Sequence, residues 1–368
     1  MPISRDETAL LVLEDGTVFR GQAVVGGTRF AEVVFNTSMT GYQEILTDPS
    51  YRGQIVVMTQ PHIDNYGVAR DVAESSKIWV EGFVARCFTV RPSGVAPEES
   101  LPTYLKRQEV PALEGIDTRA LVRHLRQHGA LRGVVTSERS EVAPLLAELQ
   151  DFPTMAGRAL VDEVTSPERY GLPAQGEERA HLAVFDYGVK RNILRNLCER
   201  GARLTVLPAR TTARECLELG VDGVVLSNGP GDPEPLESII ETVRELAASG
   251  KPIFGICLGH QLLGLALGGR TFKLKFGHHG GNQPVKDLAT GRVAITSQNH
   301  GFAVDPASLP AGCRPAELNL NDGTLESFAV ADRPIFAAQY HPEAAPGPHD
   351  ASPLFDRFLA VVRREGGQ

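Results

Sequence analysis

The stretch IFGICLGHQLLGLAL, residues 253–267, places one cysteine between an apolar strand and a helix. Its first part is typical of a buried strand and its second part of a helix, so Cys257 is predicted to lie on the sharp turn that joins them. The flanking Gly255 and Gly259 leave room for tight backbone geometry and for close approach of strand and helix. This Gly-x-Cys-x-Gly arrangement is the layout of a nucleophile elbow.

The position of Cys257 predicts a reactive thiol. At a helix N-terminus, the partial positive charge of the unpaired N–H groups favours the thiolate, which is the nucleophilic form. The alternative is that Cys257 is a small buried hydrophobe, as most free cysteines are. The elbow by itself leaves both interpretations open.

A candidate base lies far downstream, where QYHPE, residues 339–343, follows an apolar segment that is typical of a strand. Successive side chains of an extended chain alternate in direction, and Pro342 favours an extended His341, so His341 and Glu343 are expected to point the same way. His341 would then deprotonate Cys257, while Glu343 accepts the other imidazole N–H and fixes the tautomer. The alternative is a surface His-Pro-Glu turn, but its place downstream of a cysteine elbow favours catalysis.

The loop SNGPGDP, residues 227–233, ends another apolar strand and is a candidate oxyanion site. Most Gly/Pro-rich runs of this kind are ordinary strand-ending loops. If the loop faces the elbow across the carboxyl ends of a parallel sheet, the backbone amides of Gly229 and Leu258 can form an oxyanion hole.

These three pieces together resemble the class I glutamine amidotransferases, and the chain as a whole is similar to the small-subunit family of carbamoyl phosphate synthetases. Class I motifs alone also fit the glutaminase parts of anthranilate, guanylate or cytidylate synthesis, so the two N-terminal stretches carry the finer assignment. The resembling stretches are residues 35–44, 46–51, 227–233, 254–261, 275–282, 298–302 and 341–343.

The resemblance implies a set of site residues. It makes Cys257, His341 and Glu343 the catalytic triad. It implies that L-glutamine is held by Ser50, Gly229, Gly231, Leu258, Gln261, Asn299, Gly301 and Phe302.

The resemblance also implies a partner. A large synthetase subunit, in a heterodimer or a higher oligomer, would join ammonia, bicarbonate and two ATP into carbamoyl phosphate for arginine and pyrimidine synthesis. ATP and Mg²⁺ would bind to that subunit, and no cofactor is expected on this chain. Because free ammonia is largely protonated at neutral pH, its direct transfer to the partner is expected.

The 368 residues suffice for two domains. An N-terminal small-subunit domain of mixed α/β structure is predicted over residues 1–150, and a breaker-rich linker over residues 151–180. From residue 181 onward, apolar strands alternate with helices, which predicts an α/β amidotransferase domain over residues 181–368 with a central, largely parallel sheet. Ligands of such sheets bind at the carboxyl ends of the strands.

Composition excludes several other classes. The formal charge of −8 argues against nucleic acid and acidic membranes as partners. No signal peptide or long apolar run is found, so a cytoplasmic location is expected. The five cysteines are scattered without Cys-x-x-Cys spacing, which disfavours disulfides and structural zinc. A metal site built on His278, His279, His300 and His341 is also disfavoured, because no carboxylate or thiolate spacing supports it, and none is predicted. No P-loop or dinucleotide fingerprint is present.

Two other functions are compatible with parts of this pattern. A stand-alone γ-glutamyl cysteine hydrolase would use the same triad without an acceptor subunit, but the N-terminal domain argues against it. A regulatory scaffold without catalysis has no reason to retain Cys257, His341 and Glu343 together.

Overall fold

The fold is that of a computed structural model, which describes residues 7–94 and 98–366. The chain divides into two compact units. The first consists of residues up to 158 together with residues 275–279, and the second of residues 159–274 and 280 onward. In the part of the chain that the structure describes, no helix has the length and apolar character needed to cross a bilayer.

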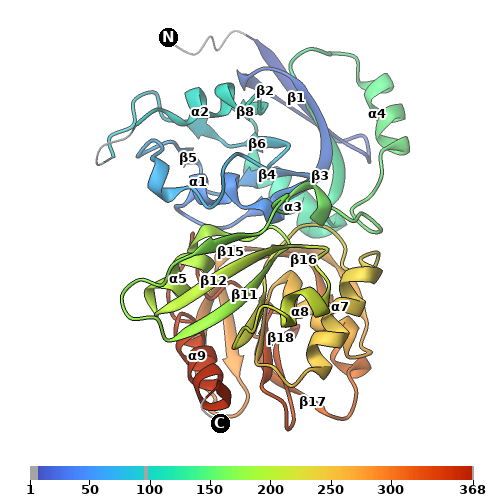
Figure 1. Cartoon of the computed structure of the whole chain (residues 1–368). Coiled ribbons are helices and arrows are strands. Elements are labelled where there is room, and N and C mark those ends of the chain that lie inside the picture. Colours follow the sequence, from blue (N-terminus) through green and yellow to red (C-terminus); the bar gives the residue numbers. More distant parts are fainter. Residues whose placement is uncertain (1–6, 95–97, 367–368) are drawn as a thin grey trace. The chain divides into compact units, whose positions relative to one another are not determined.

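The first unit is built on a closed barrel of parallel and antiparallel strands (Figure 1). Its barrel order is β1 (Thr8–Leu13), β2 (Val18–Val25), β8 (Ala112–Glu114), β6 (Gly82–Val84), β4 (Gln54–Met58), β3 (Thr28–Asn36) and β9 (Leu131–Thr136). Strands β1 and β2 form an antiparallel hairpin. A separate pair consists of β5 (His62–Ile63) and β7 (Cys87–Phe88).

The helices of the first unit cover both faces of its strands. They are α1 (Tyr42–Thr47), α2 (Leu101–Arg107), α3 (Thr118–His128) and α4 (Val142–Asp151), with 3-10 turns η1 (Pro49–Tyr51) and η2 (Arg70–Val72). Strand β1 alternates between two cores. Leu11 packs in the cluster that holds Leu121 of α3, whereas Leu10 packs with Leu145 of α4. This is why the whole strand is apolar.

Helix α3 is capped at both ends. Asp117 accepts a hydrogen bond from the Ala120 amide at its start, and Gly129, at a positive φ of 107°, ends it.

The second unit contains a sheet of ten strands among its described residues. Its order is β10 (Tyr170–Leu172), β12 (Ala202–Pro208), β11 (Ala180–Asp186), β13 (Gly223–Leu226), β14 (Ile253–Ile256), β19 (Ile335–Ala338), β18 (Leu325–Val330), β17 (Cys313–Asn319), β15 (Thr271–Asp287) and β16 (Val293–Val304). Strands β12, β11, β13, β14 and β19 are parallel to one another, and they form the predicted parallel part of the sheet. Beyond the parallel strands, β18 pairs antiparallel with β19.

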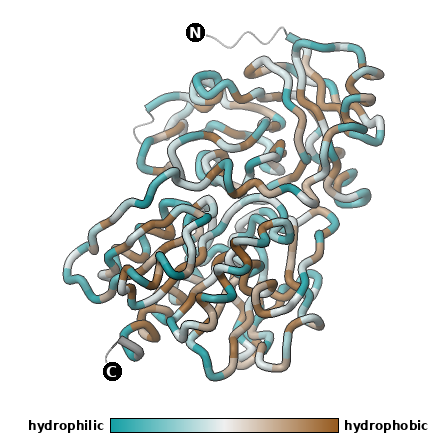
Figure 2. Tube along the Cα trace, turned by 45° about the vertical axis from the view of Figure 1, so that its right-hand side comes forward, coloured by the Kyte–Doolittle hydropathy of each residue, from teal (hydrophilic) through white to brown (hydrophobic). Residues whose placement is uncertain are grey.

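Helices cover both faces of the parallel strands (Figure 1). Helices α6 (Ala213–Leu217), α7 (Glu237–Ala248) and α8 (Leu258–Ala266) pack in one core cluster, and α5 (Arg191–Glu199) and α9 (Pro353–Gly366) in the other. Figure 2 shows apolar stretches along the interior strands of each unit. Burial on two faces explains why these strands read as continuous apolar runs.

Residues 151–180, expected to be a linker, contain regular structure. They hold η3 (Val161–Glu163) and strand β10, which pairs antiparallel with β12. The boundary between the units falls after Arg158, and residues 275–279 of β15 group with the first unit. The prolines and glycines of this stretch predict a linker. Strand β10 was not predicted, because a short strand with exposed side chains has no alternation of apolar and polar residues.

Gly259 offers a test of the elbow's packing. A Cβ at this position would lie 2.2 Å from the Leu226 carbonyl oxygen, whereas a Cβ at Gly312 would meet nothing within 4 Å. We expect Gly259→Ala to lower the free energy of unfolding by about 1–3 kcal/mol, since the backbone of β13 must shift. The control Gly312→Ala should stay within about 0.5 kcal/mol of wild type in the same denaturant titration. Equal effects at the two positions would contradict the close approach.

Candidate active site

Cys257 lies between β14 and α8 with its backbone in the left-handed region, at φ 53° and ψ −101°. Such a conformation of a non-glycine residue costs on the order of 1–3 kcal/mol and persists only where the surroundings impose it. Here the Cys257 amide donates to the Ala338 carbonyl oxygen at 2.8 Å, and the Gly259 amide donates to that of Ser227 at 3.0 Å. The elbow is therefore anchored to the strands on both sides, β19 and β13.

The Cys257 thiol is buried, with 2% of the residue exposed. Its Sγ donates to the Asn299 carbonyl oxygen at 3.6 Å, and the Gln339 amide nitrogen donates to Sγ at 3.7 Å. Asn299, which the sequence places among the glutamine-binding residues, thus adjoins the nucleophile.

His341 and Glu343 form the predicted pair. His341 Nδ1 lies 2.7 Å from Glu343 Oε1, which fixes the tautomer with Nε2 free to exchange a proton. Nε2 is buried, and none of the described residues forms a hydrogen bond with it. His341 is extended, as Pro342 predicts, and forms an antiparallel β-bridge with Ser297. The chain does not stay extended as far as Glu343, because it turns after His341, where the Ala344 amide donates to the His341 carbonyl oxygen at 3.1 Å.

Lys190 is a member of this site that sequence reasoning did not single out. Its Nζ lies 2.9 Å from Glu343 Oε1 and donates to the Ala344 carbonyl oxygen at 2.6 Å, and its side chain is 2% exposed. Lys190 follows β11, whose carboxyl end lies at the same edge of the sheet as that of β14. The available signal was a lysine between a buried strand and the following helix, but lysines are mostly exposed, so the sequence alone does not indicate a buried one.

The charges of the site determine its protonation. Burial opposes a charge on His341, but the negative charges of Glu343 and of the Cys257 thiolate outweigh it and raise the pKa of His341 to about 10. Burial likewise opposes a charge on Glu343, but Lys190 and His341 lower its pKa to about 2. At neutral pH His341 is therefore an imidazolium, held against the carboxylate of Glu343 and close to the sulfur of Cys257.

His260 is a second histidine near the nucleophile, three residues along α8. Burial lowers its pKa to about 3, and its ring packs against that of Phe328 with centroids 4.8 Å apart. It is therefore neutral at physiological pH, and His341 carries the acid–base role.

Several of the other predicted binding residues lie with Cys257 in the second unit. Gly229 approaches the elbow so closely that a Cβ on it would lie 2.7 Å from Leu258 Cδ2. The Gln261 amide nitrogen donates to the Phe302 carbonyl oxygen at 2.8 Å. The oxyanion hole and the glutamine contacts of Gly229, Gly231, Leu258, Gln261, Asn299, Gly301 and Phe302 stay predictions.

Ser50 belongs to the first unit. It is buried in η1, where its amide donates to Asp48 Oδ1 at 2.9 Å. Its contact with glutamine stays a prediction.

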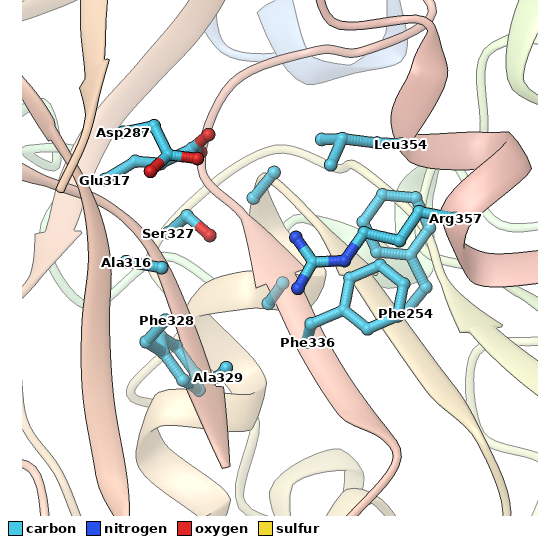
Figure 3. A pocket seen from close by; sticks show the side chains of 12 residues that line it. Phe254, Asp287, Ala316, Glu317, Ser327, Phe328, Ala329, Phe336, Leu354 and Arg357 are labelled. Atoms are coloured by element: carbon cyan, nitrogen blue, oxygen red, sulfur yellow. The ribbon is translucent and has the colours of Figure 1, made fainter. Parts of the chain in front are cut away.

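A small cavity lies between β14, β17, β18, β19 and α9, all within the second unit (Figure 3). Its volume of about 30 Å³ has room for water but not for glutamine, since ligand pockets measure about 300–1,000 Å³. Figure 3 shows Arg357 pointing across it toward Asp287 and Glu317. Glu317 also accepts a 2.6 Å hydrogen bond from the Tyr340 hydroxyl, which anchors the residue before His341.

Comparison with known proteins matches the two parts of the chain to two families. Residues 183–361 match the family described as "Glutamine amidotransferase class-I", and residues 11–135 match "Carbamoyl-phosphate synthase small chain, CPSase domain". The carbamoyl phosphate synthase small chain of Vibrio parahaemolyticus is 51% identical over 372 residues, covering 97% of this chain and 98% of the relative. That of Yersinia pseudotuberculosis is 51% identical, covering 97% and 95%.

The chain belongs to the carbamoyl phosphate synthase small-chain family. The match to the N-terminal CPSase domain separates it from other class I amidotransferases, as the N-terminal sequence stretches predict. The fold of a small-chain CPSase domain followed by a class I amidotransferase domain is confirmed.

The cysteines differ in their surroundings, which predicts selective labelling. Burial raises the pKa of Cys198, of Cys313 and, to about 12, of Cys216, so these thiols stay protonated at neutral pH. Cys257 alone among the buried cysteines adjoins an imidazolium in the described structure. We expect a glutamine-like chloroketone to modify Cys257 first, as mapped by mass spectrometry. Faster labelling at Cys198 or Cys216 would contradict the assignment.

Glu343→Gln tests the buried charges through stability. At neutral pH the variant leaves Lys190 and His341 without their anion, which should lower the free energy of unfolding by about 3–5 kcal/mol. Because the folded-state pKa of Glu343 is depressed, its contribution is present above about pH 4.5 and is lost as pH falls toward 2. Denaturant titrations of both proteins at descending pH should therefore show a shrinking difference. A difference that stays constant with pH would contradict the ionised state of Glu343.

Proposed function

We propose that this chain is the glutaminase subunit of a glutamine-hydrolysing carbamoyl phosphate synthetase. The observation that carries the proposal is a buried row of alternating charges, Lys190, Glu343 and His341, that ends beside the sulfur of Cys257. A thiolate paired with an imidazolium is a nucleophile and an acid ready for acyl transfer. Membership in the small-chain family supplies the substrate, L-glutamine, and the synthetase context.

The reaction begins when the Cys257 thiolate attacks the side-chain amide carbon of glutamine. The resulting oxyanion would be stabilised by the amides of Gly229 and Leu258. His341 donates its Nε2 proton to the leaving nitrogen, so ammonia departs and a γ-glutamyl thioester remains. His341, now neutral, removes a proton from water, which hydrolyses the thioester to glutamate and restores the thiolate. Glu343 and Lys190 keep the imidazole oriented through both half-reactions.

The ammonia would pass to a large ATP-using subunit that makes carbamoyl phosphate for arginine and pyrimidine biosynthesis. ATP and Mg²⁺ would be bound by that subunit, and this chain would act in the cytoplasm. Two observations support this division of labour over a stand-alone γ-glutamyl hydrolase or a non-catalytic scaffold. Residues 11–135 match the CPSase small-chain domain, which a simple hydrolase does not need. The buried hydrogen bond between His341 and Glu343, close to Cys257, supports a catalytic role over a scaffold.

The Cys257→Ser variant distinguishes a synthetase subunit from a stand-alone hydrolase and from a scaffold. A serine hydroxyl is far less ionised than a thiol, so glutamine-driven carbamoyl phosphate synthesis by the reconstituted two-subunit complex should fall at least about 100-fold. The partner's chemistry needs only ammonia, so synthesis from ammonium salt, bicarbonate and ATP should stay close to the wild-type rate.

The matched control is Cys313→Ser, which changes a half-buried cysteine on β17. It should retain both activities. Loss of the ammonium-driven rate in Cys257→Ser, or failure of any large subunit to bind, would count against a synthetase subunit. Retention of the glutamine-driven rate would count against the nucleophile.

A further inference from the structure

Gln339 lies between the end of β19 and His341, and its side chain is fully buried. Its backbone amide donates to the Glu326 carbonyl oxygen at 2.7 Å, which ties it to β18. Its side-chain nitrogen is 3.7 Å from Cys257 Sγ, within the range of an N–H···S hydrogen bond. The residue thus joins the segment that carries the base to the nucleophile itself.

The orientation of the Gln339 amide follows from its neighbours. Gln261 must turn its nitrogen toward the Phe302 carbonyl oxygen, which can only accept, at 2.8 Å. The same nitrogen lies 3.2 Å from Gln339 Oε1 and donates to it. With its oxygen held by Gln261, Gln339 has its nitrogen directed at Sγ. The Phe302 carbonyl therefore orients the Gln261 amide, and Gln261 in turn orients Gln339 so that its N–H points at the Cys257 sulfur.

This donor matters because the sulfur also faces an acceptor. In the thiol form, Sγ–H donates to the Asn299 carbonyl oxygen at 3.6 Å. In the thiolate form that contact becomes repulsive, since both atoms carry negative charge. The Gln339 N–H, by contrast, becomes a charge-assisted hydrogen bond, which is stronger than a neutral one.

We propose that Gln339 is a positioning residue for the nucleophile: its amide N–H, oriented through Gln261 by the Phe302 carbonyl, holds the Cys257 sulfur and stabilises its thiolate form. The inference rests on the proposed glutaminase function and adds to it a group outside the Cys257–His341–Glu343 triad. The inference also assigns Gln261 a second role. In addition to the predicted contact with glutamine, Gln261 orients the amide that holds the nucleophile.

The test compares the rate constant for alkylation of Cys257 by iodoacetamide at pH 7 between the wild-type chain and two Gln339 variants. Mass spectrometry identifies the modified cysteine. Gln339→Met keeps the size of the side chain and removes the donor. Gln339→Glu is nearly isosteric, still accepts from Gln261, and turns an oxygen toward the sulfur. We expect the rate constant to fall about tenfold in Gln339→Met and at least as much in Gln339→Glu, as loss of a hydrogen bond to a charged group predicts.

Steady-state glutamine hydrolysis gives a second readout. Loss of thiolate positioning should lower kcat about tenfold and leave KM within about twofold, because substrate binding is not altered. A raised KM at unchanged kcat would overturn the proposal, since it would show that Gln339 acts only through the glutamine pocket. Unchanged alkylation in both folded variants would overturn it as well.

Gln54→Met is the matched control. Gln54 is a buried glutamine on β4 of the first unit, and its side-chain nitrogen contacts Glu32 at 3.5 Å. This variant should alkylate at the wild-type rate, and an equal loss in it would show that removal of any buried amide suffices. The experiment needs neither ATP nor a partner. An unreactive wild-type Cys257 would refute the proposed function, whereas a reactive wild type matched by both Gln339 variants would refute only this inference.

Discussion

The buried carboxylate of Glu343 is the constraint on which the rest of the active site depends. Removing an ion from water costs several kcal/mol, so a buried carboxylate must be compensated by nearby cations and hydrogen bonds. Lys190 at 2.9 Å and His341 at 2.7 Å supply the compensation. His341 in turn lies close to the sulfur of Cys257. Lys190, Glu343 and His341 alternate in sign, and Glu343 keeps His341 in the protonated form that can donate a proton to the leaving nitrogen.

The parallel sheet supplies the framework for this row of charges. Lys190 follows β11, Cys257 follows β14 and His341 follows β19, and the carboxyl ends of these strands lie at one edge. Hydrogen bonds between the segments carry that alignment past the strand ends, as from Cys257 to Ala338. Helices on both faces bury the strands, so the charges lie in a medium where their mutual attraction is strong.

A second layer of contacts surrounds the reacting groups and restricts how they move. Gln339 and Gln261 link the nucleophile to the Phe302 carbonyl on β16. The hydroxyl of Tyr340 is bonded to Glu317 on β17, beside a cavity with room for water. These neighbours of His341 in sequence therefore contact different strands. The segment from residue 339 to 343 is therefore held along its length beyond the end of β19, and the His341 amide also donates to the Ser297 carbonyl oxygen of β16 at 2.8 Å.

The sequence by itself determined the class of fold and predicted the candidate catalytic residues, because the elbow and the strand-helix alternation are local patterns with fixed physical causes. A cysteine between two glycines at a strand end has few structural solutions. It also identified the family, which the relatives confirm. Only the tertiary structure revealed Lys190 and Gln339 as members of the site, the turn between His341 and Glu343, and the pairing of β10 within the expected linker. Each of these depends on contacts between distant or irregular segments. Buried ion pairs and hydrogen bonds between side-chain amides join residues that are distant in sequence. They leave no periodic pattern along the chain, so the sequence alone does not indicate them.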